Sequence, residues 1–548
     1  MFSSEPPSDP HDRQNPGLAR SAGVTGIATL ASRVLGLVRE QVLAALFGAG
    51  NEMDAFIVAF RIPNLVRDLF AEGAMSAAFV PAFTRHLTLH GKPAAWRFGN
   101  NVLNTLFLVT TPLVVAGLVF ARPLVTLYAG DYASVPGKLE LTIQLTRVMM
   151  PFLVAVVVAA AAMGMLNSLH YYFVPALSPA TFNVATIVCA VVLVPLMPSL
   201  GLPRIMAIAA AVLLGGFGQI LIQWPPLARE GFRYAPVFDP GDKALRDVVW
   251  LMGPGTIGLA ATQVNIFVNT LLATSQGTGA VSWLTFAFRL VYLPIGLFGV
   301  SIATATLPAV SRHAALDDLA QIRRTVSRGL SLMLMLNVPA TLGLLVLARP
   351  IVELLFEHGR FTAADTEATA AALRLYAVGL IGHSATRIMS PIFYALRQSR
   401  TAVAASLAAI VVNVLLSLSL IGWLGFSGLA LATSVAALAN GGLLVLLLRR
   451  RLKGIEGDRL IIVLTKIVAA AVAMAVAAWG IEYLMTALLP GQALLIRGVR
   501  LLTAIGGGLV VVAVVAKMLR IEEFEDALGV LGVQFTKYRG ATHGNRGD

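Results

Sequence analysis

Long apolar segments follow one another along nearly the whole chain, separated by short stretches that contain proline, glycine or clustered charges. A helix that crosses the hydrocarbon core of a bilayer needs about 20 predominantly apolar residues. Fourteen such spans are expected, beginning near residues 22, 55, 101, 142, 173, 204, 248, 280, 327, 367, 402, 426, 461 and 497. The second and eighth are the least regular, because charges and a proline interrupt them. The pattern predicts an all-α polytopic membrane protein with fourteen transmembrane helices.

An internal repeat divides most of this pattern into two halves. Four short matches recur at a nearly constant offset of 227 to 230 residues: Ala59-Phe60-Arg61 with Ala287-Phe288-Arg289, Pro81–His86 with Pro308–His313, Ala121-Arg122-Pro123 with Ala348-Arg349-Pro350, and Asn183 with Asn413. Each half holds six spans, and an even number of spans keeps both halves in the same orientation, so the repeat is parallel. Proteins built this way usually bind substrate between the halves and expose it to alternate sides.

The repeat sets the expected domain boundaries. We expect a disordered cytoplasmic tail over residues 1–20, an N-terminal lobe over 21–228, a cytoplasmic linker over 229–246, a C-terminal lobe over 247–452, two further spans over 453–520, and a cytoplasmic tail over 521–548. The fold is therefore expected to contain two parallel six-helix lobes plus two additional C-terminal helices.

Composition and charge support a membrane location. The chain is 57% hydrophobic and 13% charged, whereas soluble domains carry about 25% charged residues. The net charge of +13 is dispersed through short loops rather than gathered in one domain, which favours anionic membrane lipids over nucleic acid as partners. Loops after even-numbered spans hold 18 Lys and Arg, and those after odd-numbered spans hold 8. The even loops and both termini are therefore expected to be cytoplasmic.

Charged residues inside the spans are the candidates for function. They are costly in lipid and usually face a cavity or a partner. Most belong to the first two spans: Arg33, Arg39, Glu40, Asp54, Arg61, Arg67, Asp68 and Glu72. The equivalent spans of the second half contain chiefly Arg289.

Helical geometry groups these residues into faces. Arg33 and Glu40 are seven residues apart and lie about 20° from each other around a regular helix. A face about 40° wide on the second span carries four more: Asp54, Arg61, Asp68 and Glu72. Arginine is in surplus over acid at depth, and its planar fork suits bidentate binding of phosphate oxygens. The sequence thus predicts a buried anion as ligand. The alternative is that carboxylates and arginines only neutralise each other, with Arg39 and Asp54 reaching toward headgroups.

A family resemblance coincides with these residues. The segments that carry it are Ser32-Arg33-Val34-Leu35-Gly36-Leu37-Val38-Arg39-Glu40, Phe47-Gly48-Ala49-Gly50, Asp54-Ala55-Phe56, Pro63-Asn64-Leu65-Val66-Arg67, Phe70-Ala71-Glu72-Gly73-Ala74 and Ala78-Phe79-Val80-Pro81. In order and spacing they resemble the N-terminal signature of the MurJ (MviN) family of lipid II flippases. Weaker similarity extends over all fourteen spans.

The resemblance implies a fold and an activity. The fold is that of the multidrug/oligosaccharidyl-lipid/polysaccharide exporter superfamily, with two lobes in a V around a cationic cavity and a lipid-tail groove formed by residues 453–520. The activity is translocation of lipid II, undecaprenyl-pyrophosphate carrying a disaccharide-pentapeptide, across the bacterial inner membrane for cell wall synthesis. The family's cavity arginines fall on Arg33, Arg39, Arg67 and Arg289, and Asp54 and Glu72 match its acidic positions. No bond is made or broken, so no catalytic residue, metal or cofactor is expected.

The chain also departs from the family pattern. Glu40 stands where the family often has Asp, and Phe288 and Tyr292 stand where acidic residues usually flank Arg289. Arg289 therefore lacks its local counter-charges. The resemblance implies coupling to membrane potential or to a monovalent cation such as sodium, although spans eight, eleven and twelve contain no deep carboxylate.

Four other functions are consistent with parts of the pattern. A flippase for another polyprenyl-linked glycan would differ only in the headgroup bound. A multidrug-cation antiporter would need buried carboxylates rather than surplus arginine. A membrane enzyme is disfavoured, because paired loop carboxylates, metal-binding histidine spacing and a P-loop are missing, and the lone Cys189 and His383 read as packing residues. A non-transporting scaffold is disfavoured, because a scaffold gains nothing from costly charges at depth. Separately, the peptidoglycan-synthesis machinery is an expected partner, through charged segments such as 454–459.

Overall fold

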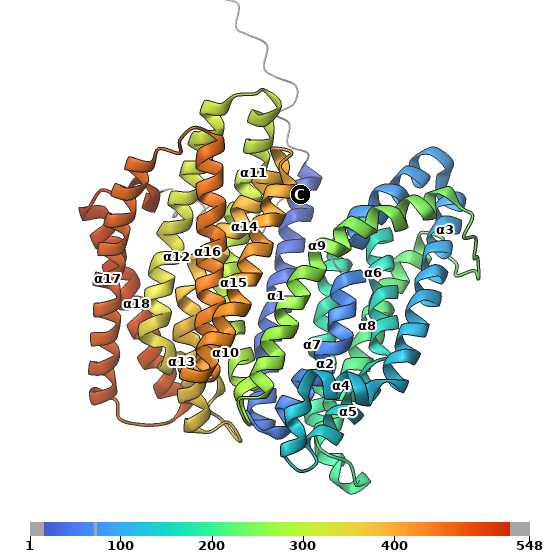
Figure 1. The fold of residues 1–548 in the computed structure, drawn as a ribbon, viewed down its shortest axis with the longest axis horizontal. Coiled ribbons are helices and arrows are strands. Elements are labelled where there is room, and N and C mark those ends of the chain that lie inside the picture. The colour runs from blue at the N-terminus through green and yellow to red at the C-terminus, as the bar shows by residue number, and fades with distance from the viewer. Residues whose placement is uncertain (1–15, 71–73, 526–548) are drawn as a thin grey trace, which may run out of the picture.

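The computed structural model describes residues 16–70 and 74–525, which form two groups of helices. In Figure 1 the first group, α2 to α8, lies on the right and the second, α10 to α18, on the left, with α1 and α9 between them. The two groups are close together at the lower end of this view and diverge toward the upper end. The V shape expected from the resemblance is therefore present.

The described residues of the first half form eight α-helices and three short 3-10 turns. Their bounds are α1 Pro16–Phe47, α2 Asn51–Phe70, α3 Ala74–Val119, α4 Ala121–Ala129, η2 Gly130–Ser134, α5 Lys138–Met149, α6 Phe152–Ser168, α7 Phe173–Val192, η3 Val194–Leu196, η4 Pro198–Leu200 and α8 Met206–Arg229. Helix α1 packs on α7, and α2 on α5. Helix α1 begins at Pro16, inside the segment 1–20 that was expected to be a disordered tail.

The second half begins with α9, which packs against α3 of the first group and α15 of the second. Its elements are α9 Lys243–Thr274, α10 Ala280–Pro294, the π-helix η5 Ile295–Gly299, α11 Val300–Ala315, α12 Leu319–Phe356, α13 Ala363–Val378, α14 Leu380–Ala395, α15 Ser399–Leu424, α16 Phe426–Arg451, α17 Gly457–Leu488 and α18 Leu494–Met518. The last two helices pack together and against α12, at the left edge of Figure 1.

Each of the fourteen expected spans begins on a helix or within two residues of one. Within the part of the chain that the structure describes, ten helical segments are long and apolar enough to cross a membrane by length and composition. Large side chains such as Trp423 and Leu495 are 90% and 79% exposed, as expected for surfaces that face lipid. The fold is an all-α membrane protein, consistent with fourteen spans.

Interruptions in the helices follow from the local sequence. Gly91 has a φ of 75° and separates two helical stretches inside α3, between the second and third expected spans. Pro294 precedes the π-helix that interrupts the eighth span between α10 and α11, because proline removes a backbone donor. The fourth span breaks between α5 and α6, and the tenth breaks at the corresponding place between α13 and α14, so the internal repeat is visible in the helices.

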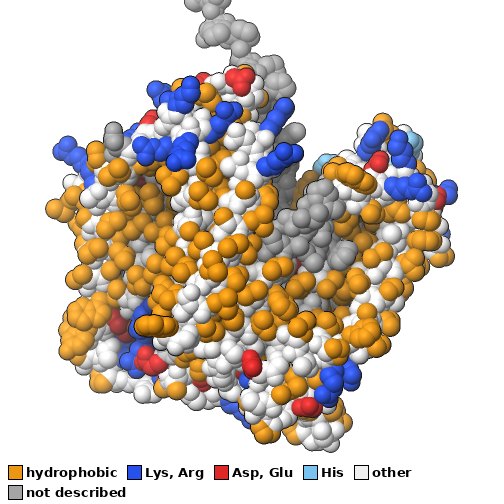
Figure 2. All heavy atoms as spheres, viewed as in Figure 1, with side chains coloured by type: hydrophobic (Ala, Val, Ile, Leu, Met, Phe, Trp, Pro, Cys, Tyr) orange, Lys and Arg blue, Asp and Glu red, His pale blue; other side chains and the backbone are white. Residues whose placement is uncertain are grey.

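Basic side chains gather at the end where the two groups diverge, as the blue atoms at the top of Figure 2 show. The last turn of α16, with Arg449, Arg450 and Arg451, belongs to this end. The surface between the two groups is hollowed there. Both α1 and the described C-terminus reach the same end.

Candidate functional site

Two arginines from different halves of the chain share one carboxylate. Glu40, on α1, is 4% exposed and forms an ion pair with its neighbour Arg39. Arg289, on α10, places its Nε 2.9 Å from the Glu40 Oε1. Arg39 also lies 5.2 Å from the centre of the Phe182 ring. Two positive charges and one negative charge therefore meet between the groups, and the counter-charge missing from α10 itself is supplied by Glu40.

Arg33 extends the positive charge along the same face of α1. Its side chain is exposed, and a Cβ built on Gly296 of η5 would lie 2.8 Å from Arg33 Nη1. Only glycine leaves room for the guanidinium at that position. The wheel that placed Arg33 and Glu40 on one face of α1 agrees with this arrangement, because both residues contact the α10–η5 segment.

The second expected face, on α2, is spread over its length rather than gathered at one point. Arg61 is half-buried and close enough to Arg289 for their charges to interact. Arg67 forms an ion pair with Asp68 at 2.6 Å, and Asp68 also accepts a hydrogen bond from Gln263 of α9 at 3.1 Å. Glu72 lies outside the described residues.

Asp54 lies apart from the arginines, at the narrow end of the V. Its carboxylate is 0% exposed and forms an ion pair with Lys138 of α5 at 2.9 Å. The same carboxylate accepts hydrogen bonds from the backbone N–H groups of Gly279 at 2.7 Å and Ser282 at 3.1 Å, and from the Ser282 hydroxyl at 2.7 Å. Asp54 thus caps the N-terminus of α10 across the two groups, where the helix dipole favours negative charge. We call Asp54, Lys138, Gly279 and Ser282 the latch.

Close backbone contacts surround the latch. The Arg360 backbone N–H donates to the Ala45 carbonyl at 2.8 Å, and the Arg360 side chain pairs with Glu52 at 3.3 Å. A Cβ on Gly359 would lie 2.2 Å from the Ala45 carbonyl oxygen, and Gly359 has a φ of 60°. These short approaches close the molecule at its narrow end.

A second buried ion network joins the last two helices to α12. Arg497 of α18 is 7% exposed and pairs with Glu353 of α12 and with Glu357, the residue after α12, each at 3.1 Å. Arg500, one turn further along α18, lies 3.9 Å from Glu353. The network fixes α18 to the second group at the end opposite the basic side chains.

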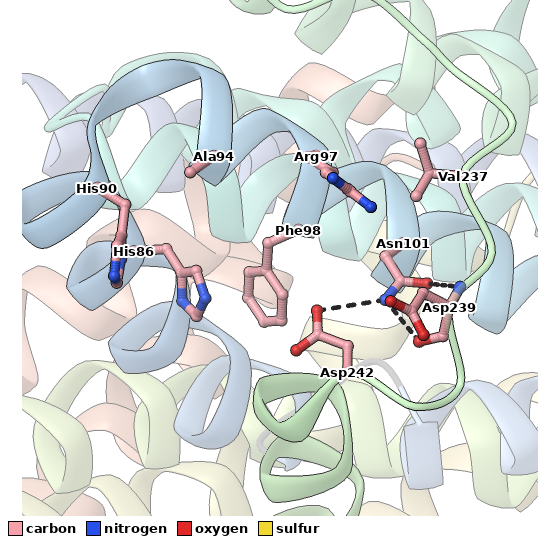
Figure 3. Close-up of a pocket in the computed structure, with 9 residues that line it drawn as sticks. All are labelled: His86, His90, Ala94, Arg97, Phe98, Asn101, Val237, Asp239 and Asp242. Carbon is pink, nitrogen blue, oxygen red and sulfur yellow. Dashed lines mark hydrogen bonds between the residues drawn. The ribbon is translucent and has the colours of Figure 1, made fainter.

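A pocket of 260 Å³ lies beside the kink of α3, at the basic end of the first group. In Figure 3, His86 and His90 stand on one side and Asn101 with Asp239 and Asp242 on the other. The Asn101 side chain donates to the Asp239 carbonyl at 2.9 Å and accepts from the Asp239 backbone N–H at 2.8 Å. These amide contacts fasten the linker between the two halves along α3.

The same linker is tied to the first group by Glu230, which accepts hydrogen bonds from Lys92 at 2.8 Å and from the Tyr171 hydroxyl at 2.7 Å. These two donors lower the pKa of the Glu230 carboxyl, because they stabilise its charged form. The aromatic ring of Phe232 packs edge-on against Trp96, with the ring centres 5.3 Å apart. The linker that precedes α9 is therefore held against the first group.

Sequence reasoning missed several of these partners. Lys138 is one of the 8 basic residues counted in the loops after odd-numbered spans, although its side chain is 1% exposed and paired with Asp54. A polar contact between α9 and α15 was also not predicted. Asn413 of α15 donates to the side-chain oxygens of Asn265 and Asn269 of α9 at 2.6 and 3.0 Å. Among the described residues, His, Cys, Asp and Glu form no cluster of three that could hold a metal ion.

Comparisons with known proteins agree on one family. A family model described as "Lipid II flippase MurJ" matches residues 43–498. The chain is 36% identical over 500 residues to a probable lipid II flippase MurJ of Bdellovibrio bacteriovorus, covering 89% of this chain and 92% of that protein. It is 35% identical over 428 residues to the lipid II flippase MurJ of Burkholderia cenocepacia, covering 77% and 82%.

Solved structures share the fold. A lipid II flippase MurJ in an inward closed conformation superposes with a TM-score of 0.73 at 24% identity, covering 90% of this chain and 99% of that one. An inward-facing multidrug resistance MATE family transporter of the MOP superfamily superposes with a TM-score of 0.66 at 17% identity, covering 79% and 99%.

Proposed function

The chain belongs to the MurJ family of lipid II flippases, and we propose that its arginines receive the pyrophosphate of lipid II during transfer from the cytoplasmic to the periplasmic leaflet. The protein is a transporter rather than an enzyme, and it works in the bacterial inner membrane for peptidoglycan synthesis. The residue roles that follow are proposals built on the contacts described above.

One observation supports the arginine site above all others. Arg39 and Arg289 come from different lobes and share the single carboxylate of Glu40, so the place where the lobes meet retains positive charge. A pyrophosphate is too costly to carry bare through hydrocarbon, and arginine forks pair with phosphate oxygens in a bidentate geometry. Arg33 on α1, with Arg61 and Arg67 on α2, would add to the same positive field.

The latch would keep the periplasmic side closed while the headgroup enters from the cytoplasm. The basic end of the molecule is the cytoplasmic one under the positive-inside rule, which places both termini in the cytoplasm and Asp54 on the periplasmic side. Release of Gly279 and Ser282 from Asp54 would let the lobes rock apart at that side. The polyprenyl tail would stay in lipid, beside the apolar pair α17 and α18.

The test of this proposal uses cells depleted of their own flippase. Arg33→Ala and Arg67→Ala are each expected to abolish support of growth while membrane levels of the protein stay normal. Lysine at the same positions separates charge from fork geometry. Growth at the wild-type rate with both alanine variants would remove the arginine site from the mechanism. A lipid II translocation assay in proteoliposomes, with and without a membrane potential, then measures transport and its driving force.

Two related activities give different outcomes in a binding assay. A flippase for another polyprenyl glycan would bind undecaprenyl pyrophosphate but prefer a headgroup other than the disaccharide-pentapeptide. A multidrug antiporter would be stabilised against heat by an organic cation such as tetraphenylphosphonium and not by the pyrophosphate lipid. Contact with the peptidoglycan-synthesis machinery is a separate proposal, for which the charged segment 454–459 is the candidate surface.

A further inference from the structure

Arg387 of α14 is a deep arginine to which the arginine site above assigns no role. Its side chain is exposed, although it lies eight residues inside the end of a helix that packs against α11, α12 and α16. One Nη donates to the Tyr292 hydroxyl of α10 at 2.9 Å, and the guanidinium carbon lies 5.9 Å from the centre of the Tyr292 ring. Tyr292 therefore holds the arginine by both its hydroxyl and its ring.

The α10–η5 segment presents its polar contacts on one face. At about 100° per residue, Arg289, Tyr292 and Gly296 fall within about 60° of one another. These residues meet Glu40 of α1, Arg387 of α14 and Arg33 of α1 respectively. Since α10 runs from the latch toward the cytoplasmic end, Tyr292 and Gly296 lie about 4.5 and 10 Å further from the latch than Arg289 does.

Charge distinguishes two levels along this face. At the level of Arg289, the carboxylate of Glu40 offsets part of the positive charge. One to two turns closer to the cytoplasm, neither Arg33 nor Arg387 forms an ion pair with any residue in the described part of the chain. An arginine at this depth without a carboxylate is costly, and an anionic ligand offsets that cost. Tyr292, an uncharged residue, orients Arg387 without neutralising it.

We propose that Arg387, positioned by Tyr292, forms with Arg33 a second anion-binding level on the cytoplasmic side of Arg39 and Arg289. This level takes one phosphate of the lipid pyrophosphate while the deeper level takes the other. The proposal rests on the proposed flippase function and deepens it. Tyr292 thereby recruits an arginine from α14 as a ligand for a diphosphate rather than a monophosphate.

The test measures dissociation constants of the purified full-length chain for undecaprenyl pyrophosphate and undecaprenyl monophosphate by native mass spectrometry. Arg387→Ala is expected to weaken pyrophosphate binding about 10-fold and monophosphate binding about 2-fold or less, with an unchanged melting temperature. Arg387→Lys should recover part of the loss, and Tyr292→Phe should weaken pyrophosphate binding about 3-fold by freeing the guanidinium. Arg400→Ala, an exposed arginine at the start of α15, is the matched control and should change neither constant.

The outcomes separate this inference from the function on which it rests. Unchanged pyrophosphate affinity in both Arg387→Ala and Tyr292→Phe, with weakened binding in Arg39→Ala, overturns the second level and leaves the flippase proposal standing. Equal loss for both lipids also overturns it, because a second phosphate site must discriminate between them. If wild type and all arginine variants bind the pyrophosphate lipid equally poorly, the proposed function fails first. If Arg387→Ala lowers the melting temperature, the pyrophosphate affinity of Tyr292→Phe decides the test, because that variant keeps the aromatic ring and the charge of Arg387.

Discussion

The latch makes a quantitative prediction for the balance between closed and open periplasmic sides. Ser282→Ala removes one hydroxyl that donates to Asp54 at 2.7 Å and leaves the backbone donor at 3.1 Å in place. A hydrogen bond to a charged group contributes about 1.5–3 kcal/mol, and the remaining donors partly compensate. We expect the closed state to lose about 1.4 kcal/mol, which is a tenfold shift in the ratio of open to closed molecules.

Ser282 is a better site for this test than Asp54 itself. Asp54→Asn would leave Lys138, whose side chain is 1% exposed, buried without its counter-charge, at a cost of about 3–5 kcal/mol. Both of those residues belong to the first lobe, so that cost would fall on folding in every conformation. The Ser282 bond crosses between the lobes and is lost only when they separate.

The shift can be measured by double electron–electron resonance, which gives the distance between two spin labels placed on opposite sides of the latch. Ala133 of η2 and Ala364 of α13 are exposed on opposite lobes, and Cys189, the only native cysteine, is 3% exposed, which favours labelling at the introduced positions. The long-distance population should grow about tenfold relative to the short one in Ser282→Ala. Ser301→Ala, whose hydroxyl bonds within its own helix, is the control. Distance distributions that are the same in both variants and wild type would refute the latch.

Three further substitutions test other contacts. Glu40→Gln removes the carboxylate shared by two arginines. We expect several-fold tighter binding of undecaprenyl pyrophosphate and slower lipid II translocation, because Glu40 competes with the pyrophosphate for the arginines. Weaker binding would contradict that role. Gly296→Ala places a Cβ 2.8 Å from the Arg33 guanidinium, so transport should fall while the melting temperature holds, and a normal transport rate would show that Arg33 tolerates displacement. Arg497→Ala leaves Glu357 without its ion pair and Glu353 with only Arg500 at 3.9 Å. This loss should lower unfolding stability by about 1–3 kcal/mol in a denaturation assay, whereas an unchanged midpoint would show that apolar packing alone holds α18.

Much of the fold follows from the sequence because a bilayer imposes a simple physical rule. Backbone groups cannot remain unpaired in hydrocarbon, so apolar segments of sufficient length must become helices. Expected starts such as those near residues 173 and 461 therefore fall on α7 and α17. The repeat likewise survives as matching breaks in the fourth and tenth spans. The break at Gly91 falls between the second and third expected spans, and the sequence did not show that helix continues on both sides of a single residue with positive φ.

The candidate site was only partly readable for a different reason. A helical wheel gives the direction of a side chain around its own helix, and it placed Arg33 and Glu40 on one face of α1. It carries no information about which helix lies opposite. Arg289 appeared to lack a counter-charge because its own helix holds none, whereas Glu40 comes from a helix about 250 residues earlier in the chain.

By itself the sequence determined the membrane class and the surplus of deep arginine, and it predicted fourteen spans and the orientation expected from loop charge. Only the tertiary structure decided how those charges are shared. It placed Asp54 with Lys138 at the closed end and Arg387 against Tyr292 beside the arginines. The physical reason is that hydropathy and periodicity act within one helix, while an ion pair in a membrane forms between helices that the chain brings together from distant segments.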